Sequence, residues 1–465
     1  MGFFLSILYF VTYYLTPTTM FGPLAAAHIE MILAVLVSLV SLPALMRSFI
    51  LKTPQSLALL GLALAVFLSV LIGMNWPGRA LFSILGFIPN AFAYMLVCLH
   101  CNSKKKLQVL VAMLLFVCLF VITRGYIDLR HGISDTNTSQ AGAVGTGANP
   151  AAANATSYVL SMRNDAGDTF YRIRGQGEIN DPNDFGQLLV CVLPLPFIFW
   201  QTKKTSRNIS FVLLPVCILL YGIFLTRSRG ALLALVAVVL LAARRRIGTI
   251  PALIIACGVF AAAMALHFTG GRDISAESGY DRLSLWGSGL ELLKEHPLFG
   301  VGYGNLQDYL GLTAHNSLVV CAADLGMFGL YFWSLFLFPT MWNSWVIASP
   351  KLVSEGKPIV AEEELFPQPA SKIETIDKTE INRLGRLMFL SLTGFLVAGW
   401  FLSRALVMTL FLLGGMAEVV FEMALQRGMV APRMRLGRVL LYSGILAVSM
   451  VVLMYILLRV TNLTR

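Results

Sequence analysis

The chain is a succession of long apolar runs separated by short polar connections. The runs are about 17–25 residues long, the length of helix that crosses the hydrocarbon core of a bilayer. Inside that core every backbone amide must be paired within its own segment, so each run is predicted to be a helix. The alternating pattern of about ten residues that marks a membrane β-strand is absent. The sequence therefore predicts an all-α integral membrane protein.

About 12–13 transmembrane helices are expected from the number of apolar runs. No signal-peptide cleavage site follows the first run, so that run is expected to remain as an anchor. The runs 387–402 and 405–425 meet at Ser403 and Arg404, and these two runs are also compatible with a re-entrant hairpin. The predicted ranges are 3–16, 28–46, 56–74, 80–99, 107–123, 185–201, 209–226, 230–243, 249–267, 317–345, 387–402, 405–425 and 439–458.

Longer polar segments divide these helices into groups. We expect N-terminal helices at 1–123, a first long loop at 124–184, central helices at 185–267, a second long loop at 268–316, and C-terminal helices at 317–465. A third polar segment, at 346–386, lies within the last group. Both long loops are predicted on one side of the membrane and this third segment on the other.

Composition and charge support this organisation. Of the 465 residues, 57% are hydrophobic and 13% are charged, which is too little polar surface to coat a soluble globule of this size. If the N-terminus is cytoplasmic, every lysine except Lys294 lies in a cytoplasmic connection, as the positive-inside rule requires. The net charge of +11 is therefore attributed to topology, and no nucleic-acid partner is expected.

Arginine, unlike lysine, also occurs in the outward segments. A guanidinium group stays charged and offers a planar fork of donors that suits phosphate oxygens. An outward arginine can instead pair with a loop carboxylate or a lipid headgroup. For Arg174, Arg227, Arg229 and Arg282, the local sequence favours anion binding, because it places them at the mouths of helices.

The first long loop changes in character along its length. Residues 132–155 are of low complexity and cannot bury a core. The later part, YRIRGQGEINDPNDF, ends in a helix start in which Asp181 or Asn183 is the expected cap. An outward helix N-terminus offers free amides to an anion, although ordinary turn and cap chemistry explains the same residues.

Two further segments carry candidate chemistry. The TRSRG turn, 226–230, joins two outward helix ends and fixes both of its arginines on rigid elements. In the second long loop, residues 281–295 have apolar positions at helical spacing and predict an amphipathic helix on the outer surface, with Trp286 at headgroup level. The glycine-rich GVGYGN, 300–305, follows this helix, and His315 then directly precedes the next long apolar run. A histidine at that boundary titrates in a range that suits proton transfer, although most lone histidines have no chemical role.

Other chemistries are not indicated. The chain has neither a P-loop nor a His-Glu-x-x-His motif, and Cys98 and Cys101 lack a second pair of ligands, so no metal or other cofactor is expected. Glu418 and Glu422 stand one turn apart in an apolar run. They are expected to line a polar cavity or proton path, or to pair with Arg404 or Arg427.

Taken in order, these segments resemble the O-antigen ligase and polymerase superfamily of bacterial envelope glycosyltransferases. The resemblance rests on the glycine/arginine segment ending in PN, on SRGALLAL, on the arginine-bearing amphipathic helix with its G-x-G-x-G-N stretch, and on HNSLVV with LGMFGL. It covers residues 170–345 well and the rest only by hydropathy. The low-complexity loop and the 346–386 segment depart from the family pattern.

The resemblance implies a GT-C-like membrane fold and metal-independent glycosyl transfer on the periplasmic face of the bacterial inner membrane. The donor would be a glycan on undecaprenyl pyrophosphate, and the acceptor a lipid A-core or another glycan. By position, Arg174, Arg227, Arg229 and Arg282 would hold the pyrophosphate and His315 would be the base. Asn183 and Asn316 are possible orienting residues. A polymerase of the same superfamily, a transporter of lipid-linked oligosaccharide and a scaffold protein remain as alternatives.

Overall fold

The computed structural model describes residues 1–20, 28–130, 157–163, 169–266, 268, 276–353 and 377–461. This part of the chain is mainly helical, and it contains ten helices that are long and apolar enough to cross a membrane. Two shorter apolar helices, Gly2–Leu15 and Thr249–Ala265, accompany them. Every predicted apolar run corresponds to a helix, so the prediction of an all-α integral membrane protein is confirmed.

The chain divides into two compact units. Unit 1 comprises Met1–Pro43, Lys104–Asp273 and Thr393–Ala398. Its elements are α1 (Gly2–Leu15), α2 (Pro17–Met20), most of α4 (Ile29–Arg47), α7 (Lys104–Arg130), β1 (Val159–Arg163), β2 (Thr169–Ile173), η3 (Gly177–Ile179), α10 (Pro182–Val192), η4 (Leu195–Phe199), α11 (Thr205–Asn208), η5 (Ile209–Leu213), α12 (Leu214–Thr226), α13 (Arg229–Ile247) and α14 (Thr249–Ala265).

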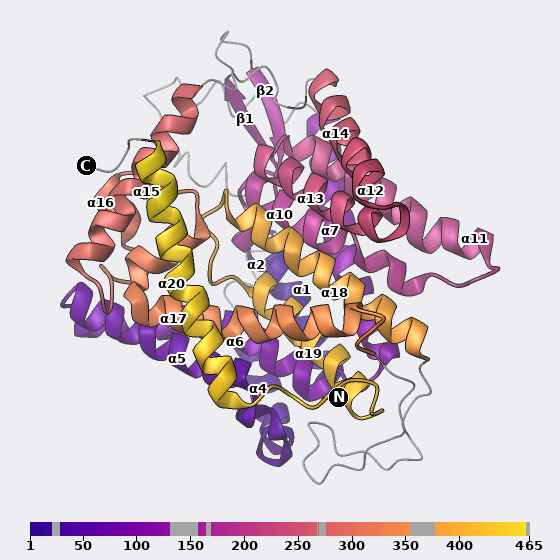
Figure 1. Cartoon of the computed structure of the whole chain (residues 1–465), viewed down its shortest axis with the longest axis horizontal. Helices are drawn as coiled ribbons and strands as arrows, with labels where there is room; N and C mark the ends of the chain where they lie inside the picture. Colours follow the sequence, from indigo (N-terminus) through magenta and orange to yellow (C-terminus); the bar gives the residue numbers. More distant parts are fainter. Residues whose placement is uncertain are drawn as a thin grey trace. The chain divides into compact units, whose positions relative to one another are not determined.

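Unit 2 comprises Ala44–Ser103, Ile274–Leu392 and Gly399–Arg465. Its elements are η1 (Phe49–Lys52), α5 (Pro54–Leu68), η2 (Ser69–Gly73), α6 (Pro77–His100), α15 (Ala276–Glu295), α16 (Leu306–Leu310), α17 (Ser317–Ala348), most of α18 (Lys378–Gly399), α19 (Met408–Leu425) and α20 (Leu436–Val460). Helix α19 is buried along almost its whole length, and α6 and α17 pack against it. Helix α20 packs across α17 (Figure 1) and exposes a row of large apolar side chains, as a lipid-facing helix does.

A two-stranded antiparallel hairpin is the only sheet in the described residues. β1 and β2 lie side by side in Figure 1, with Val159 opposite Ile173 and Arg163 opposite Thr169. Hydropathy does not reveal this hairpin, because its strands are short and stand in a polar loop. It packs on α7, where Gly125 leaves room for Ile173: an added Cβ would lie 2.9 Å from that side chain.

In unit 1 the predicted helix start after the first long loop is present. The Asp181 side chain caps α10 by accepting a hydrogen bond of 2.7 Å from the Asn183 amide. Pro182 occupies the first turn, where its missing amide hydrogen is not needed. The low-complexity segment 132–155 lies outside the described residues.

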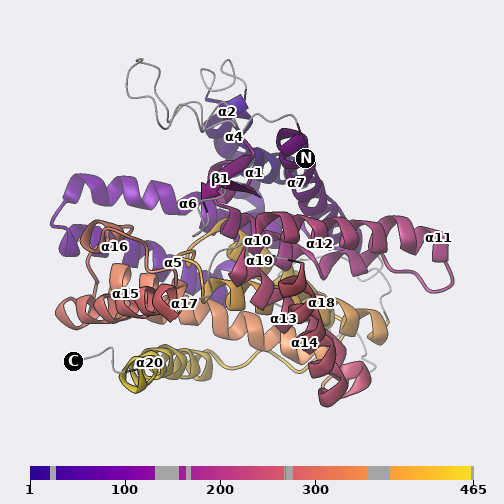
Figure 2. The same ribbon diagram turned by 90° about the horizontal axis from the view of Figure 1, so that it is seen from above.

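In unit 2 the predicted amphipathic helix is α15, which packs along α17 (Figure 2). Trp286, Leu290 and Leu293 are buried in it, as their helical spacing predicts. Gly289 allows the close approach, because an added Cβ would collide with the side chain of Val319.

Helix α17 is broken at Gly326, whose backbone has φ 66° and ψ −170°. The segment 297–302 runs along the break and repairs it with four backbone hydrogen bonds. Two amides of that segment, Val301 and Gly302, donate to carbonyls of α17, at 2.9 and 3.0 Å. Two carbonyls of the same segment accept from the amides of Met327 and Phe328, at 2.8 and 3.1 Å. The irregular backbone inside this apolar helix is thus covered by protein, as a bilayer requires.

The GVGYGN stretch therefore has a structural role in α17. Gly300, Gly302 and Gly304 all have positive φ, which favours glycine. The buried carboxylate of Asp324 accepts hydrogen bonds from the amides of Gly304, at 3.0 Å, and Leu306, at 2.9 Å. Together these contacts fix the loop that leads from α15 to His315.

Candidate functional site

The TRSRG turn of unit 1 is as tight as the sequence predicts. Helix α12 ends at Thr226, and Arg227 follows in the left-handed conformation, with φ 48°. Ser228 caps α13, its hydroxyl accepting a hydrogen bond of 3.3 Å from the Ala231 amide. Arg229 is the first residue of α13. Both arginines therefore stand on helix ends that a two-residue connection holds in place.

A third arginine, Arg172 on β2, fastens this turn. It is buried, with 3% of its surface exposed. Its Nε donates to the Thr226 carbonyl at 2.7 Å, and its Nη2 donates to Asn183 Oδ1, also at 2.7 Å. A cation at the C-terminal end of α12 satisfies a carbonyl that the helix leaves unpaired and matches the helix dipole. Arg172 thus joins β2, α10 and the TRSRG turn.

The sequence did not single out Arg172, because it gives no sign of which face of β2 is buried. The alternation of Tyr171, Arg172 and Ile173 was the only available signal. The structure gives Asn183, predicted as an orienting residue, a definite partner in Arg172.

Arg174 and Arg227 are both partly withdrawn from water. Arg174 donates from its amide to the Tyr158 carbonyl at 2.9 Å and from Nε to the Ser157 carbonyl at 3.2 Å. Burial lowers the pKa of Arg174, and the neighbouring Asp181 opposes this shift. Burial likewise lowers the pKa of Arg227, whose guanidinium lies 5.8 Å from the centre of the Phe170 ring. Guanidinium groups stay charged under such shifts, so an anion that approached would meet charges screened less than in water.

Helix α10 approaches the TRSRG turn closely at Gly186. An added Cβ there would lie 2.9 Å from the Ala231 side chain and 3.2 Å from both Ser228 Cβ and Thr226 Oγ1. Glycine is thus needed at position 186 because the turn lies so close to it, and not because the backbone adopts a conformation that favours glycine. It brings the capped start of α10 against the two arginine-bearing helix ends.

In unit 2, His315 and Asn316 form the start of α17. Asn316 is fully buried and caps the helix, its Oδ1 accepting from the amides of Leu318, at 2.9 Å, and Val319, at 3.2 Å. His315 is half-buried and has φ 49°, in the left-handed region. The Thr313 hydroxyl lies 3.3 Å from His315 Nε2. The predicted orienting residue Asn316 therefore fixes the backbone next to the histidine.

Arg282 belongs to the helix that is tied to this same segment. It is half-buried and lies one turn before Trp286 on α15, so the two side chains share a helix face. Trp286 donates from its indole nitrogen to the Ala314 carbonyl at 2.8 Å and packs edge-on against Trp400, with ring centres 5.9 Å apart. The residue before His315 is thereby anchored to the helix that carries Arg282.

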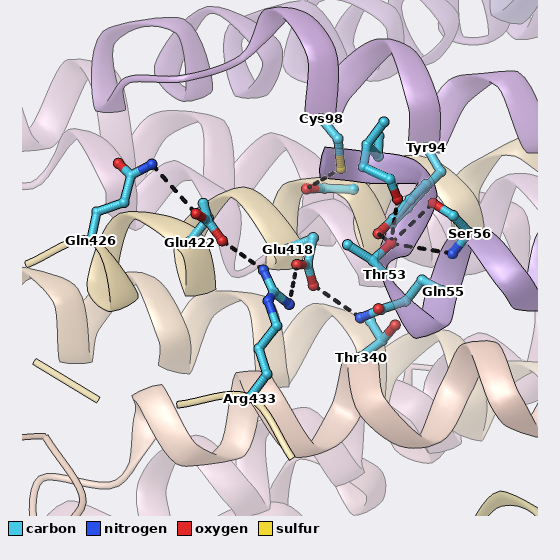
Figure 3. Close-up of polar contacts among 12 residues, drawn as sticks. Thr53, Gln55, Ser56, Tyr94, Cys98, Thr340, Glu418, Glu422, Gln426 and Arg433 are labelled. Carbon is cyan, nitrogen blue, oxygen red and sulfur yellow. Dashed lines mark hydrogen bonds and ion pairs between the residues drawn. The ribbon is translucent and has the colours of Figure 1, made fainter. Parts of the chain in front are cut away.

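A separate buried polar cluster in unit 2 surrounds Glu418 and Glu422 (Figure 3). Arg433 reaches both carboxylates, at 2.5 Å from Glu418 Oε1 and 2.6 Å from Glu422 Oε2. Gln55 donates to Glu418 Oε2 at 2.9 Å. Arg433, which the sequence did not single out, is thus a partner of both carboxylates. Arg427, one of the two predicted partners, donates to the Met423 carbonyl at 2.5 Å.

In the described part of the chain, no group of three or more histidine, cysteine or acidic residues is placed to hold a metal ion. The predicted site residues fall into two sets. Unit 1 brings together Arg174, Arg227, Arg229 and Asn183, and unit 2 contains Arg282, His315 and Asn316.

The family model described as O-antigen ligase matches residues 214–334. The match spans α12 to the first part of α17 and includes Arg227, Arg229, Arg282, His315 and Asn316, whereas Arg174 and Asn183 precede it. A search of curated proteins gave no match to the chain. Residues 214–334 therefore support the predicted resemblance to the O-antigen ligase and polymerase superfamily, in a chain whose described part contains ten helices long and apolar enough to cross a bilayer.

Proposed function

We propose that the protein transfers a glycan from undecaprenyl pyrophosphate to an acceptor hydroxyl, at the periplasmic face of the bacterial inner membrane. The preferred acceptor is a lipid A-core, which makes the protein an O-antigen ligase. The observation that carries the proposal is the TRSRG turn. It holds Arg227 and Arg229 on rigid helix ends within the segment that matches the family, and buried Arg172 fixes its geometry.

In the proposed reaction, the acceptor oxygen attacks the anomeric carbon of the donor glycan. The bond between that carbon and the phosphate oxygen breaks, and its electron pair leaves with undecaprenyl pyrophosphate. Arg174, Arg227, Arg229 and Arg282 stabilise the negative charge that develops on this leaving group. Preorganised donors of this kind are effective because they need no rearrangement during the reaction.

His315 is the proposed base. Its neutral imidazole accepts the proton that the acceptor hydroxyl loses as the new glycosidic bond forms. The strained backbone of His315 supports a functional role, since a non-glycine residue keeps such a conformation only where its surroundings impose it. Pyrophosphate is a good leaving group, so the reaction needs no acid catalyst, nucleotide or metal.

The test is transfer by purified protein from a synthetic undecaprenyl-pyrophosphate glycan, in the presence of a chelator. Lipid A-core and a second lipid-linked repeat serve as alternative acceptors. Wild type should transfer the glycan, and His315→Ala should bind the donor but fail to transfer it. Arg207→Lys is the matched control, because Arg207 is an exposed arginine that lies over Phe211 on neighbouring η5.

The acceptor that is used separates ligase from polymerase. Transfer only to the lipid-linked repeat would assign polymerisation instead of ligation. If neither acceptor is glycosylated while proteoliposomes move the lipid-linked glycan across the bilayer, the protein is a transporter and the proposal is wrong.

A further inference from the structure

The turn between α18 and α19 is bound to the segment that carries His315. The Ser403 hydroxyl oxygen accepts a hydrogen bond of 2.9 Å from the His315 amide. Two more bonds join Ser317 to the same turn: its hydroxyl donates to the Leu402 carbonyl at 2.6 Å and accepts from the Arg404 amide at 3.0 Å. Three hydrogen bonds therefore hold residues 402–404 against residues 315–317, although the two segments are more than 80 positions apart in the sequence.

These bonds act on a backbone that is held on both sides of His315. On one side, the Ala314 carbonyl accepts the Trp286 indole hydrogen. On the other, Asn316 has an extended backbone, with φ −151°, and is fixed by its cap on α17. The left-handed φ of 49° at His315 is unfavourable for a residue with a Cβ. The Ser403 hydroxyl accepts the hydrogen bond of the His315 amide itself, so it acts directly on the residue whose backbone is strained.

We propose that Ser403 is a positioning residue for the base of the reaction. It holds the His315 backbone in the left-handed conformation and so aims the imidazole at the acceptor hydroxyl. The inference rests on the proposed role of His315 in glycosyl transfer. The rate of such a reaction depends strongly on how the reacting groups are positioned, because a displacement of about 1 Å in one of them lowers the rate about 100-fold.

The test compares Ser403→Ala with Ser403→Thr, which keeps the accepting hydroxyl. Ser403→Ala should lower kcat about 10–100-fold and leave KM for the donor unchanged, because donor binding is assigned to the arginines. Ser403→Thr should recover kcat to within about 3-fold of wild type. The control is Ser349→Ala, which removes a serine hydroxyl bonded to the Trp345 carbonyl at the other end of α17.

A double-mutant cycle with His315→Ala tests whether Ser403 acts through the histidine. In the His315→Ala background, Ser403→Ala should cause no further loss of residual activity. An equal loss in both backgrounds would overturn the inference, as would a Ser403→Ala variant with wild-type kcat. A Ser403→Thr variant that is as slow as Ser403→Ala, with an equally lowered unfolding temperature, would reduce Ser403 to a structural residue.

The His315→Ala variant alone separates this inference from the proposed function. If His315→Ala transfers glycan at the wild-type rate, the base assignment fails and the positioning role fails with it. If His315→Ala is inactive but Ser403→Ala is not impaired, the base assignment stands and only the inference about Ser403 is overturned.

Discussion

Replacing Arg433 by methionine should destabilise unit 2 strongly. This one guanidinium serves two buried carboxylates, at 2.5 and 2.6 Å. The Glu418 side chain is fully buried and that of Glu422 is 5% exposed, whereas 20% of the Arg433 side chain is exposed. Removing one partner of a buried ion pair costs about 3–5 kcal/mol, mainly because the remaining charge stays buried without compensation. Arg433→Met leaves two such charges, so we expect a loss of stability of at least this size.

The triple variant Arg433→Met, Glu418→Gln, Glu422→Gln isolates the cause. It removes all three charges and keeps the side-chain volumes similar, so most of the lost stability should return. Arg438→Met is the matched control, because Arg438 is exposed in the first turn of α20 and its loss should change stability by less than about 0.5 kcal/mol. Unfolding in detergent, followed by circular dichroism against denaturant concentration, measures all three variants.

The pH dependence of wild type gives a further check. Burial lowers the pKa of Arg433, but Glu418 and Glu422 outweigh it, and the net pKa of this guanidinium is raised. A base with a raised folded pKa contributes its stability in full below its unfolded pKa, which for arginine lies far above the pH of any such assay. Arg433 therefore contributes equally at all pH values used for such assays. Equal stability of Arg433→Met and Arg438→Met, with a triple variant less stable than the single one, would refute this account of the cluster.

Three other variants test the proposed site. Arg229→Lys keeps the charge but loses the planar fork, so glycan transfer should fall about 10–100-fold; transfer at the wild-type rate would remove Arg229 from the pyrophosphate site. Gly186→Ala should impair glycan transfer, because the added Cβ crowds the Ala231 side chain. Its control, Gly258→Ala in α14, has open space around it and should leave transfer unchanged, with protein stability equal to wild type or higher by up to about 1 kcal/mol. Equal transfer by the two variants would contradict the close contact at α10. Arg172→Lys should lower the free energy of unfolding by about 1.5–3 kcal/mol in the same assay, because a single ammonium group cannot keep both charged hydrogen bonds. The control is Arg130→Lys, at an exposed arginine. An equal denaturant midpoint for the two variants would argue against the role of Arg172 in holding the turn.

Local patterns along the chain were sufficient to predict much of the fold. Apolar runs located the helices, Asp181 was one of two predicted caps, and helical spacing identified the buried face of α15. These features depend on residues within a few positions of one another. The TRSRG turn was predictable for the same reason, since its two helix ends adjoin in sequence.

Contacts between distant segments were not predictable from one sequence. Ser403 is bonded to a residue 88 positions away, and no local pattern marks that pairing. The partner of Glu418 and Glu422 was missed because the chain reverses after α19. Gly428, with φ 62°, lies in the turn that follows Leu425, the last residue of that helix, and the Met429 amide donates back to the Ala424 carbonyl. The reversal returns Arg433 to the two carboxylates, past the nearer Arg427.

The break in α17 also limits how this region of the chain can vary in evolution. Its joint with residues 297–302 consists of backbone hydrogen bonds, so many side chains there can change without loss of a bond. The number of residues cannot change so freely, because one insertion would shift every donor past its acceptor. Positions of positive φ such as Gly326 should resist substitution as well, since an added Cβ would lie 2.6 Å from the Phe299 amide nitrogen. Natural variants should therefore differ here in side chains while conserving segment length and glycine spacing.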